Sequence, residues 1–143
     1  MNQPRMSAKR PNITKAEYET LATLRYALRQ FLRFSEEAAH NAGLTPQQHQ
    51  ALLAIKGFGG PDPITIGELA ERLQIRHHSA VGLVDRLVSQ RLIARKQSSK
   101  DRRQVFIQLR SDGEAVLDRL SEVHKLQLRR AGPKIAALLK RLR

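Results

Sequence analysis

Apolar side chains recur every three or four positions along the first third of the chain. One such series comprises Leu21, Leu24, Leu28, Phe31 and Ala38. This spacing puts the series on one face of a helix, with Ser35 as its one polar member, and a stripe of this kind needs a second helix to pack against. The spacing of Thr14 and Glu17 is that of a capping box, which predicts that the helix begins there, and Gly43 suits a left-handed helix end.

Two more capping boxes mark helices in the middle of the chain. Thr45 pairs with Gln48 in one box, and Thr65 pairs with Glu68 in the other. The apolar positions that follow at helical spacing are Ala51, Leu52, Ile55, Leu69, Ala70 and Leu73. After a turn at residues 74–76 a further helix is predicted, and its apolar positions are Ala80, Leu83, Val84, Leu87 and Val88. Two short helices joined by such a turn form the outline of a helix-turn-helix.

A β-hairpin is predicted directly after this motif. Residues 104–109 alternate between Val105, Ile107 and Leu109 on one face and Gln104, Phe106 and Gln108 on the other. This is the pattern of a half-buried strand, which would pair with residues 92–96 across a polar tip at 97–103. A long helix is predicted after the segment 111–113. Gly132 and Pro133 are expected to break or kink it before a last short helix, because proline lacks the amide and clashes with the preceding turn.

These elements predict a mainly α fold with a small β-hairpin wing. We expect a flexible basic tail at 1–13, long helices at 14–42 and 111–143, and a winged helix-turn-helix at 45–110 whose wing spans 92–109. The stripe on the first helix and the apolar residues of the last helices call for a partner, so both ends of the chain are expected to form a homodimer. The predicted dimerisation residues are Leu21, Leu24, Leu28, Phe31, Leu126, Ile135, Leu138, Leu139 and Leu142.

The charge of the chain narrows its possible partners. The 143 residues hold 26 lysines and arginines against 13 aspartates and glutamates, a formal net charge of +13. Such an excess is useful mainly when an anion binds, which indicates nucleic acid. Only 4% of the residues are aromatic, so stacking on single strands or RNA is disfavoured, and double-stranded DNA is the expected partner.

Other classes of function lack support in the sequence. Cysteine is absent, which excludes disulfides, thiolate nucleophiles and Cys-ligated zinc. No catalytic motif indicates an enzyme, and the histidines lack ligand spacing, so we expect neither a metal nor another cofactor. No apolar run approaches the roughly 18–20 residues of a membrane span, and the start of the chain has no apolar signal region. We therefore expect a cytoplasmic protein without a membrane partner.

The predicted helix that begins at His77 has a second face without apolar side chains. The polar positions at its start and on this face are Arg76, His77, His78, Ser79, Gly82, Asp85, Arg86 and Ser89. Donors, a charge and a glycine suit a helix that lies in a major groove and approaches base edges. We expect all of these positions except Asp85 and Ser89 to contact DNA, the alternative being an ordinary solvated helix face.

The predicted wing has a strongly basic tip. Residues 95–103 hold five basic residues and one acid. Basic side chains at a narrow tip suit phosphate contacts and insertion into a minor groove. The expected DNA-binding residues of the wing are Arg95, Lys96, Lys100, Asp101, Arg102 and Arg103.

Several segments form an ordered set of motifs along the chain. They are GELAERL at 67–73, HHSAVGLVDRL at 77–87, KDRR at 100–103, and Leu109 followed by Gly113. Together they resemble the MarR family of winged-helix transcriptional regulators, over nearly the whole chain from about Thr14 to Leu142.

The resemblance implies a homodimeric transcriptional regulator, most simply a repressor, on a palindromic operator. Residues 77–86 would enter the major groove, and Arg103 would insert into the adjacent minor groove with Asp101 holding the wing arginine in position. The resemblance also implies release by a small-molecule effector, a small aromatic or phenolic anion. Its pocket would be lined by Tyr18, Tyr26 and His49, for which packing or surface roles are the alternative.

Two residues depart from the pattern of the family. Arg91 stands where a glycine is usual, and Arg110 replaces the usual threonine before the long helix, so Ser111 is expected to cap that helix instead. Basic residues outside the motifs also favour a second function, that of a sequence-tolerant, charge-driven architectural protein on duplex DNA.

Overall fold

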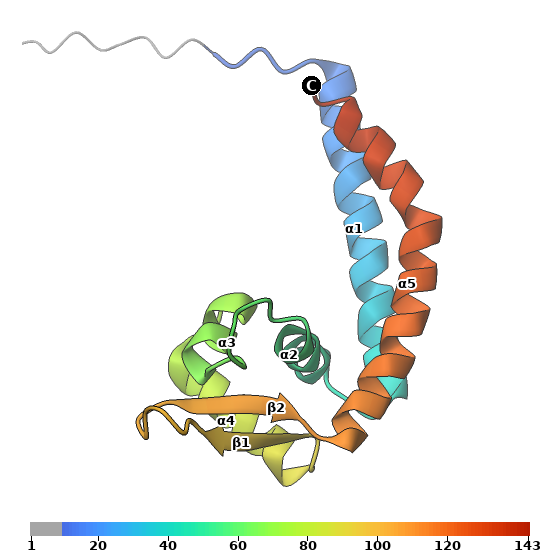
Figure 1. The fold of residues 1–143 in the computed structure, drawn as a ribbon. Helices are drawn as coiled ribbons and strands as arrows, with labels where there is room; N and C mark the ends of the chain where they lie inside the picture. Colours follow the sequence, from blue (N-terminus) through green and yellow to red (C-terminus); the bar gives the residue numbers. More distant parts are fainter. Residues whose placement is uncertain (1–9) are drawn as a thin grey trace, which may run out of the picture.

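The computed structural model describes residues 10–143, which form five helices and one two-stranded sheet (Figure 1). Residues 1–9, most of the predicted basic tail, lie outside the described residues. The elements are α1 (Lys15–Asn41), α2 (Pro46–Lys56), α3 (Ile66–Leu73), α4 (His77–Ser89), β1 (Ile93–Gln97), β2 (Val105–Leu109) and α5 (Ser111–Lys140). Among residues 10–143, no helix combines the length and the apolar character needed to cross a membrane.

The first three helices begin at the predicted capping boxes. The hydroxyls of Thr14, Thr45 and Thr65 each accept a hydrogen bond from the backbone amide three residues later. The glutamate or glutamine at that later position accepts from the amide of the threonine in return. The predicted left-handed residue after α1 is confirmed, because Gly43 has a φ of 82°.

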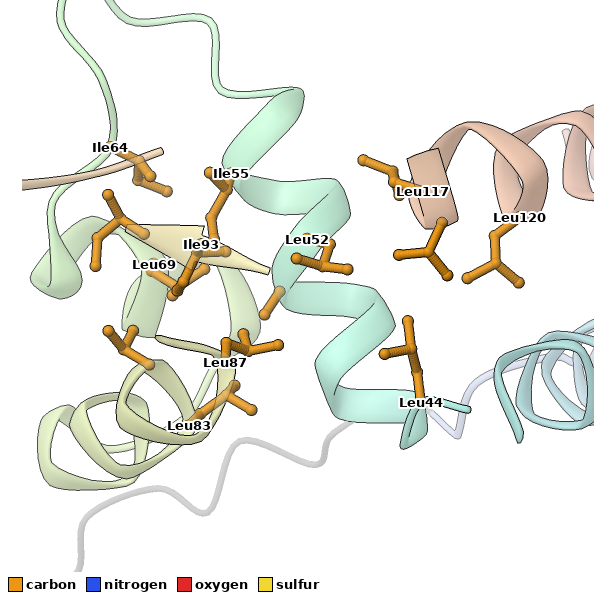
Figure 2. Packing of buried hydrophobic residues seen from close by; sticks show 14 of the residues in the cluster. Leu44, Leu52, Ile55, Ile64, Leu69, Leu83, Leu87, Ile93, Leu117 and Leu120 are labelled. Atoms are coloured by element: carbon orange, nitrogen blue, oxygen red, sulfur yellow. The ribbon is translucent and has the colours of Figure 1, made fainter. Parts of the chain in front are cut away.

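Helices α2, α3 and α4 and the hairpin form one lobe around a shared core (Figures 1 and 2). The core side chains that meet there include Leu52, Ile55, Ile64, Leu69, Leu83, Leu87 and Ile93. Leu117 and Leu120 of α5 and Leu44 before α2 extend the same cluster towards the long helices (Figure 2). The lobe is therefore joined to the rest of the molecule by continuous apolar packing.

The hairpin also pairs with the segment before α3, which the sequence analysis did not predict. β1 and β2 pair antiparallel, with Ile93 opposite Leu109. The carbonyl of Ile64 also accepts from the amide of Ile107 at 2.9 Å, and Thr65 forms a bridge to Phe106. Phe106 is half-buried for this reason, although the alternation placed it on the exposed face.

Helices α1 and α5 lie side by side and form an arm that extends away from the lobe (Figure 1). The buried residues of α1 are Thr20, Ala27, Ser35 and Ala39. Leu24, Phe31 and Ala38 of the predicted stripe are half-buried, whereas Leu21 and Leu28 are each 45% exposed. Helix α5 of the same chain thus covers one edge of the stripe, and the other edge is uncovered.

Helix α5 differs from its prediction at both ends. It runs unbroken from Ser111 to Lys140 with Pro133 inside, so the predicted break into a separate last helix is wrong. Proline clashes with the Cβ of the residue before it, and Gly132 has none, which removes one source of disruption. Figure 1 shows α5 curving along α1, which supports it. The predicted cap at Ser111 is also wrong: the cap position is Arg110, whose side chain makes no capping bond.

Candidate nucleic-acid interface

Helix α4 has two chemically different faces, as predicted. Its buried residues are Ala80, Leu83, Val84 and Leu87, which pack in the core of the lobe. The exposed side chains on the other side are His77, His78, Ser79, Asp85 and Arg86. The apolar face therefore anchors α4 and leaves a row of polar side chains facing outwards.

The turn before α4 uses a strained backbone position. Gln74 ends α3 with a left-handed φ of 54°, a conformation that costs free energy when a Cβ is present. Its side-chain amide donates to the carbonyl oxygen of Glu71 at 2.8 Å, and the amide of Ile75 donates to the carbonyl oxygen of Ala70 at 3.0 Å. These bonds stabilise the turn and set the direction in which α4 leaves it.

The start of α4 is suited to anions. The cap residue is Arg76, and its side chain makes no capping hydrogen bond, so the first amides of the helix have no partner from this side chain. The positive end of the helix dipole lies here, surrounded by the exposed side chains of Arg76, His77, His78 and Ser79. Amides and basic side chains that point the same way favour a phosphate or a base edge.

Gly82 lies in the middle of the exposed face. A Cβ built there would meet nothing within 4 Å, so packing inside the chain does not require a glycine. Glycine inside a helix costs about 1 kcal/mol relative to alanine. Because Gly82 has no side chain, the backbone of α4 is uncovered between His78 and Arg86, and another molecule can approach it there.

The wing tip is closed by its own polar groups. The amide of Ser98 donates to the carbonyl oxygen of Gln104 at 3.0 Å, and the carboxylate of Asp101 accepts from the backbone amide of Arg103 at 3.0 Å. Asp101 thus holds Arg103 through the backbone and leaves its guanidinium exposed. The other basic residues exposed on the wing are Arg95, Lys96, Lys100 and Arg102.

An ion pair joins the wing to α4. Nη2 of Arg95 in β1 donates to Oδ1 of Asp85 in α4. The sequence placed Asp85 on the polar face and Arg95 among the DNA contacts, but it did not pair them. The guanidinium has five donors, so Arg95 can hold Asp85 and still offer donors to another group. The pair fixes the wing relative to the exposed face of α4.

A buried glutamine connects α2 to the other end of α4. Gln48 is only 5% exposed, and its Oε1 caps α2 by accepting from the amide of Thr45 at 3.0 Å. Its Nε2 donates to Oε1 of Gln90, the cap residue at the end of α4, at 3.2 Å. One side chain therefore starts α2 and holds the end of α4.

The predicted dimerisation residues divide by exposure. Leu138 is buried within the chain, at 4% exposed. Leu24, Phe31 and Ile135 are half-buried. The exposed ones, at 38–53%, are Leu21, Leu28, Leu126, Leu139 and Leu142. Leu32, which the stripe omitted, is 51% exposed and adds to this apolar surface of the arm.

The three residues expected to line an effector pocket do not come together. Tyr18 and Tyr26 are 60% and 59% exposed on α1, whereas His49 of α2 is buried. A cavity of about 440 Å³ lies instead between α1 and α5. Its lining includes Phe34, Glu37, Asn41, Arg119, Leu120 and Val123.

The sequence analysis did not identify the contacts of Asp85 with Arg95 and of Gln90 with Gln48, nor that of His124 in α5 with Ser35 in α1. These contacts join residues 10, 42 and 89 positions apart respectively, and no spacing rule predicts such partners. For Asp85 a signal was present, since it is an acid on a face otherwise suited to DNA. In the part of the chain that the structure describes, no group of three or more histidine, aspartate or glutamate side chains is placed to hold a metal ion.

The central part of the chain is similar in sequence to known regulators. Residues 42–104 match the model of the MarR family. The HTH-type transcriptional repressor MdtR of Bacillus subtilis (strain 168) is 32% identical over 78 residues, which are 54% of this chain and 48% of that protein. The chain thus spans about half the length of the curated relative that it matches.

The fold extends this similarity over most of the chain. A MarR family protein from Bacillus stearothermophilus has a TM-score of 0.70 and 26% identity, covering 89% of each chain. A mutant of S. aureus MepR bound to an oligodeoxyribonucleotide has a TM-score of 0.66 and 17% identity, covering 87% of this chain and 94% of MepR. The five helices and the hairpin are therefore a winged-helix arrangement with long flanking helices.

Proposed function

We propose that the chain is a homodimeric transcriptional repressor of the MarR family that binds duplex DNA with sequence specificity, which the match of residues 42–104 to the family model supports. The observation that carries the proposal is the ion pair between Asp85 and Arg95, which joins the exposed face of α4 and the basic wing into one surface. A polar helix face fits a major groove, and an adjacent basic hairpin fits the neighbouring minor groove. The complex of the MepR mutant with an oligodeoxyribonucleotide supports this use of the fold.

The exposed residues of this surface take different roles in the proposed complex. Side chains at the start of α4 contact base edges, and Arg86 pairs with a guanine or a phosphate. Gly82 permits close approach of the DNA. Arg103 inserts into the minor groove, because Asp101 holds its backbone and leaves the guanidinium free. The phosphate contacts come from Arg76, Lys96, Lys100 and Arg102.

A second copy of the chain covers the exposed leucines of the arm. Leu21 and Leu28 of α1 and Leu126 and Leu139 of α5 are 45–53% exposed. Fully burying a leucine stabilises by about 1.5–3 kcal/mol, so covering half of each of several leucines provides a substantial driving force. A twofold dimer then presents two copies of α4 to the two halves of a palindrome.

A small aromatic or phenolic anion is the proposed effector. Phe34, Leu120 and Val123 give the cavity between α1 and α5 apolar walls that suit a ring, and Arg119 suits a carboxylate or phenolate. The cavity lies where the arm meets the lobe. A ligand there changes the spacing of the two α4 helices and releases the operator.

Selection from a library of random duplexes tests the sequence specificity. The protein should enrich a palindrome with half-sites about 10–10.5 base pairs apart or a multiple of that spacing. At about 150 mM salt the selected duplex should bind roughly 1,000-fold more tightly than a scrambled duplex of equal length. Equal affinities that fall together as salt rises would show sequence-tolerant binding, the alternative that the net charge of +13 favours.

A further inference from the structure

Two histidines are in contact where the arm meets the lobe. His49 of α2 is 3% exposed, and the centre of its ring lies 4.8 Å from that of His124 of α5. Phe31 and Phe34 of α1 pack edge-on against His124, with ring centres 6.0 and 5.3 Å away. Three helices thus meet around a pair of imidazoles.

Hydrogen bonds satisfy one imidazole and leave an atom of the other unpaired. Nδ1 of His124 lies 2.6 Å from the carbonyl oxygen of Leu120, so Nδ1 carries a proton and donates it. Nε2 of His124 lies 2.8 Å from Oγ of Ser35, and the hydroxyl can donate to it or accept from it. Nδ1 of His49, by contrast, is buried without a hydrogen-bond partner.

Among the described residues, no acidic side chain forms a hydrogen bond or an ion pair with His49. The charged groups exposed on the neighbouring turns of α1 and α5 include Glu37, His40, Asp118, Arg119, Glu122 and Lys125. Lys56 of α2 is engaged with Glu114 of α5 at 3.0 Å. Burial, and after it the charge of His124, lowers the pKa of His49 below its usual value.

We propose that His49 and His124 form a proton-sensitive joint, which holds the lobe against the arm while His49 is neutral and opens when His49 takes up a proton. In the closed joint a charged His49 is buried beside a second imidazole and has no acceptor for its Nδ1 proton. In an open joint water solvates the charge, so the open state binds the proton more tightly. Falling pH therefore favours opening. The effect is up to tenfold for each unit by which the pKa of His49 in the open state exceeds its pKa in the closed state.

The joint is coupled to the DNA-binding helix through the neighbouring residue. Gln48 precedes His49 and holds Gln90 at the end of α4. A movement of α2 is therefore passed to α4. The effect of the joint on DNA binding rests on the proposed function. A change in the position of α4 weakens binding to an operator whose two half-sites lie at a fixed spacing. Two further histidines, His77 and His78, lie on the proposed DNA surface, so the joint is best tested without DNA.

The distance between arm and lobe tests the joint directly. The chain has no cysteine, so Gln30→Cys on α1 and Ser89→Cys at the end of α4 can carry spin labels. Dilution with unlabelled protein restricts the measured distances to one chain. Between pH 8 and pH 5.5 a second distance should appear, and its share should grow at the expense of the pH 8 distance as the pH falls.

Two variants separate His49 from the other titrating groups. His49→Phe keeps a ring in the buried site and removes the imidazole, so the distance found at pH 8 should persist at pH 5.5. His40→Phe, at an exposed position of α1, is the matched control and should respond like the wild type. An unchanging distance in the wild type, or an equal response in His49→Phe, would overturn the proposal.

Proton NMR of the unmodified protein provides a second measurement that needs no variant. The C2 proton of His49 should titrate at a lower pH than histidine in an unfolded peptide. A midpoint at or above that of the peptide would contradict the buried, uncompensated site. Neither measurement uses DNA or depends on dimer formation, so failure of the joint and failure of the proposed function are distinguishable.

Discussion

Asp85→Asn removes an acid from the proposed DNA surface, and charge alone predicts tighter binding to DNA. The structure predicts a different result, because Asp85 holds Arg95 and thereby positions the wing. In an Arg95→Gln background this positioning is already lost, so Asp85→Asn should then show only the gain from the removed charge. In the wild-type background the gain should be offset by the misplaced wing.

The size of this offset follows from the exposure of the pair. The side chains of Arg95 and Asp85 are 37% and 58% exposed, so water and salt screen their attraction. Exposed pairs contribute about 0.2–1 kcal/mol in double-mutant cycles. The coupling free energy in DNA binding should therefore be about 0.2–1 kcal/mol, or about fivefold in Kd at the upper end.

The cycle comprises the wild type, Asp85→Asn, Arg95→Gln and the double variant. Anisotropy titrations of these four proteins against the selected duplex measure the coupling. Urea unfolding of the same proteins should show coupling of the same sign, since the pair also holds the wing to the lobe. The pair of Lys15 and Glu19 on α1 provides a control: it is 88% and 66% exposed and lies on the arm, so its cycle should show no coupling in DNA binding. A coupling of zero for Asp85 and Arg95 in both assays would refute the positioning role.

Other substitutions test single features of the structure. Arg110→Thr supplies the missing cap of α5 and should raise the free energy of unfolding by about 1 kcal/mol in urea; no gain would contradict the cap assignment. Arg91 has a φ of 60°, so Arg91→Gly should relieve strain and stabilise by about 0.5–1 kcal/mol, and a lower urea midpoint would argue against this. Leu28→Glu should yield monomers in sedimentation velocity with unchanged circular dichroism, whereas a persistent dimer would exclude this face. Arg103→Ala should weaken binding to the selected duplex by about 1 kcal/mol or more without affecting the dimer, and equal affinity would remove the minor-groove role.

The features that the sequence predicted correctly depend on short-range chemistry. Thr14, Thr45 and Thr65 each bond to a residue three positions away, so their capping boxes are visible in the sequence itself. The two faces of α4 follow from a repeat of three or four residues within one helix. For the same reason the exposed polar residues at the start of α4 could be named before the fold was known.

The errors occurred where packing between distant segments outweighs a local preference. Pro133 is a local signal for a break, but α5 continues through it because α1 lies alongside and Gly132 avoids one clash. The stripe on α1 was correctly read as needing a partner. Its spacing carries no information on whether that partner is α5 of the same chain or another copy.

The contacts that give the interface its geometry also lie between elements. His124 of α5 contacts His49 of α2, the adjacent Gln48 bonds to Gln90 at the end of α4, and Asp85 of α4 holds Arg95 of the wing. These contacts follow one another from the arm to the wing.

Each of these contacts joins an element to the next one in the series, so a displacement at the arm reaches the wing through α2 and α4. The coupling runs in both directions, because a change that favours one position of α4 must equally favour the matching state of the joint. DNA that holds α4 in the closed arrangement should therefore make His49 harder to protonate. This reciprocal effect requires no additional binding site.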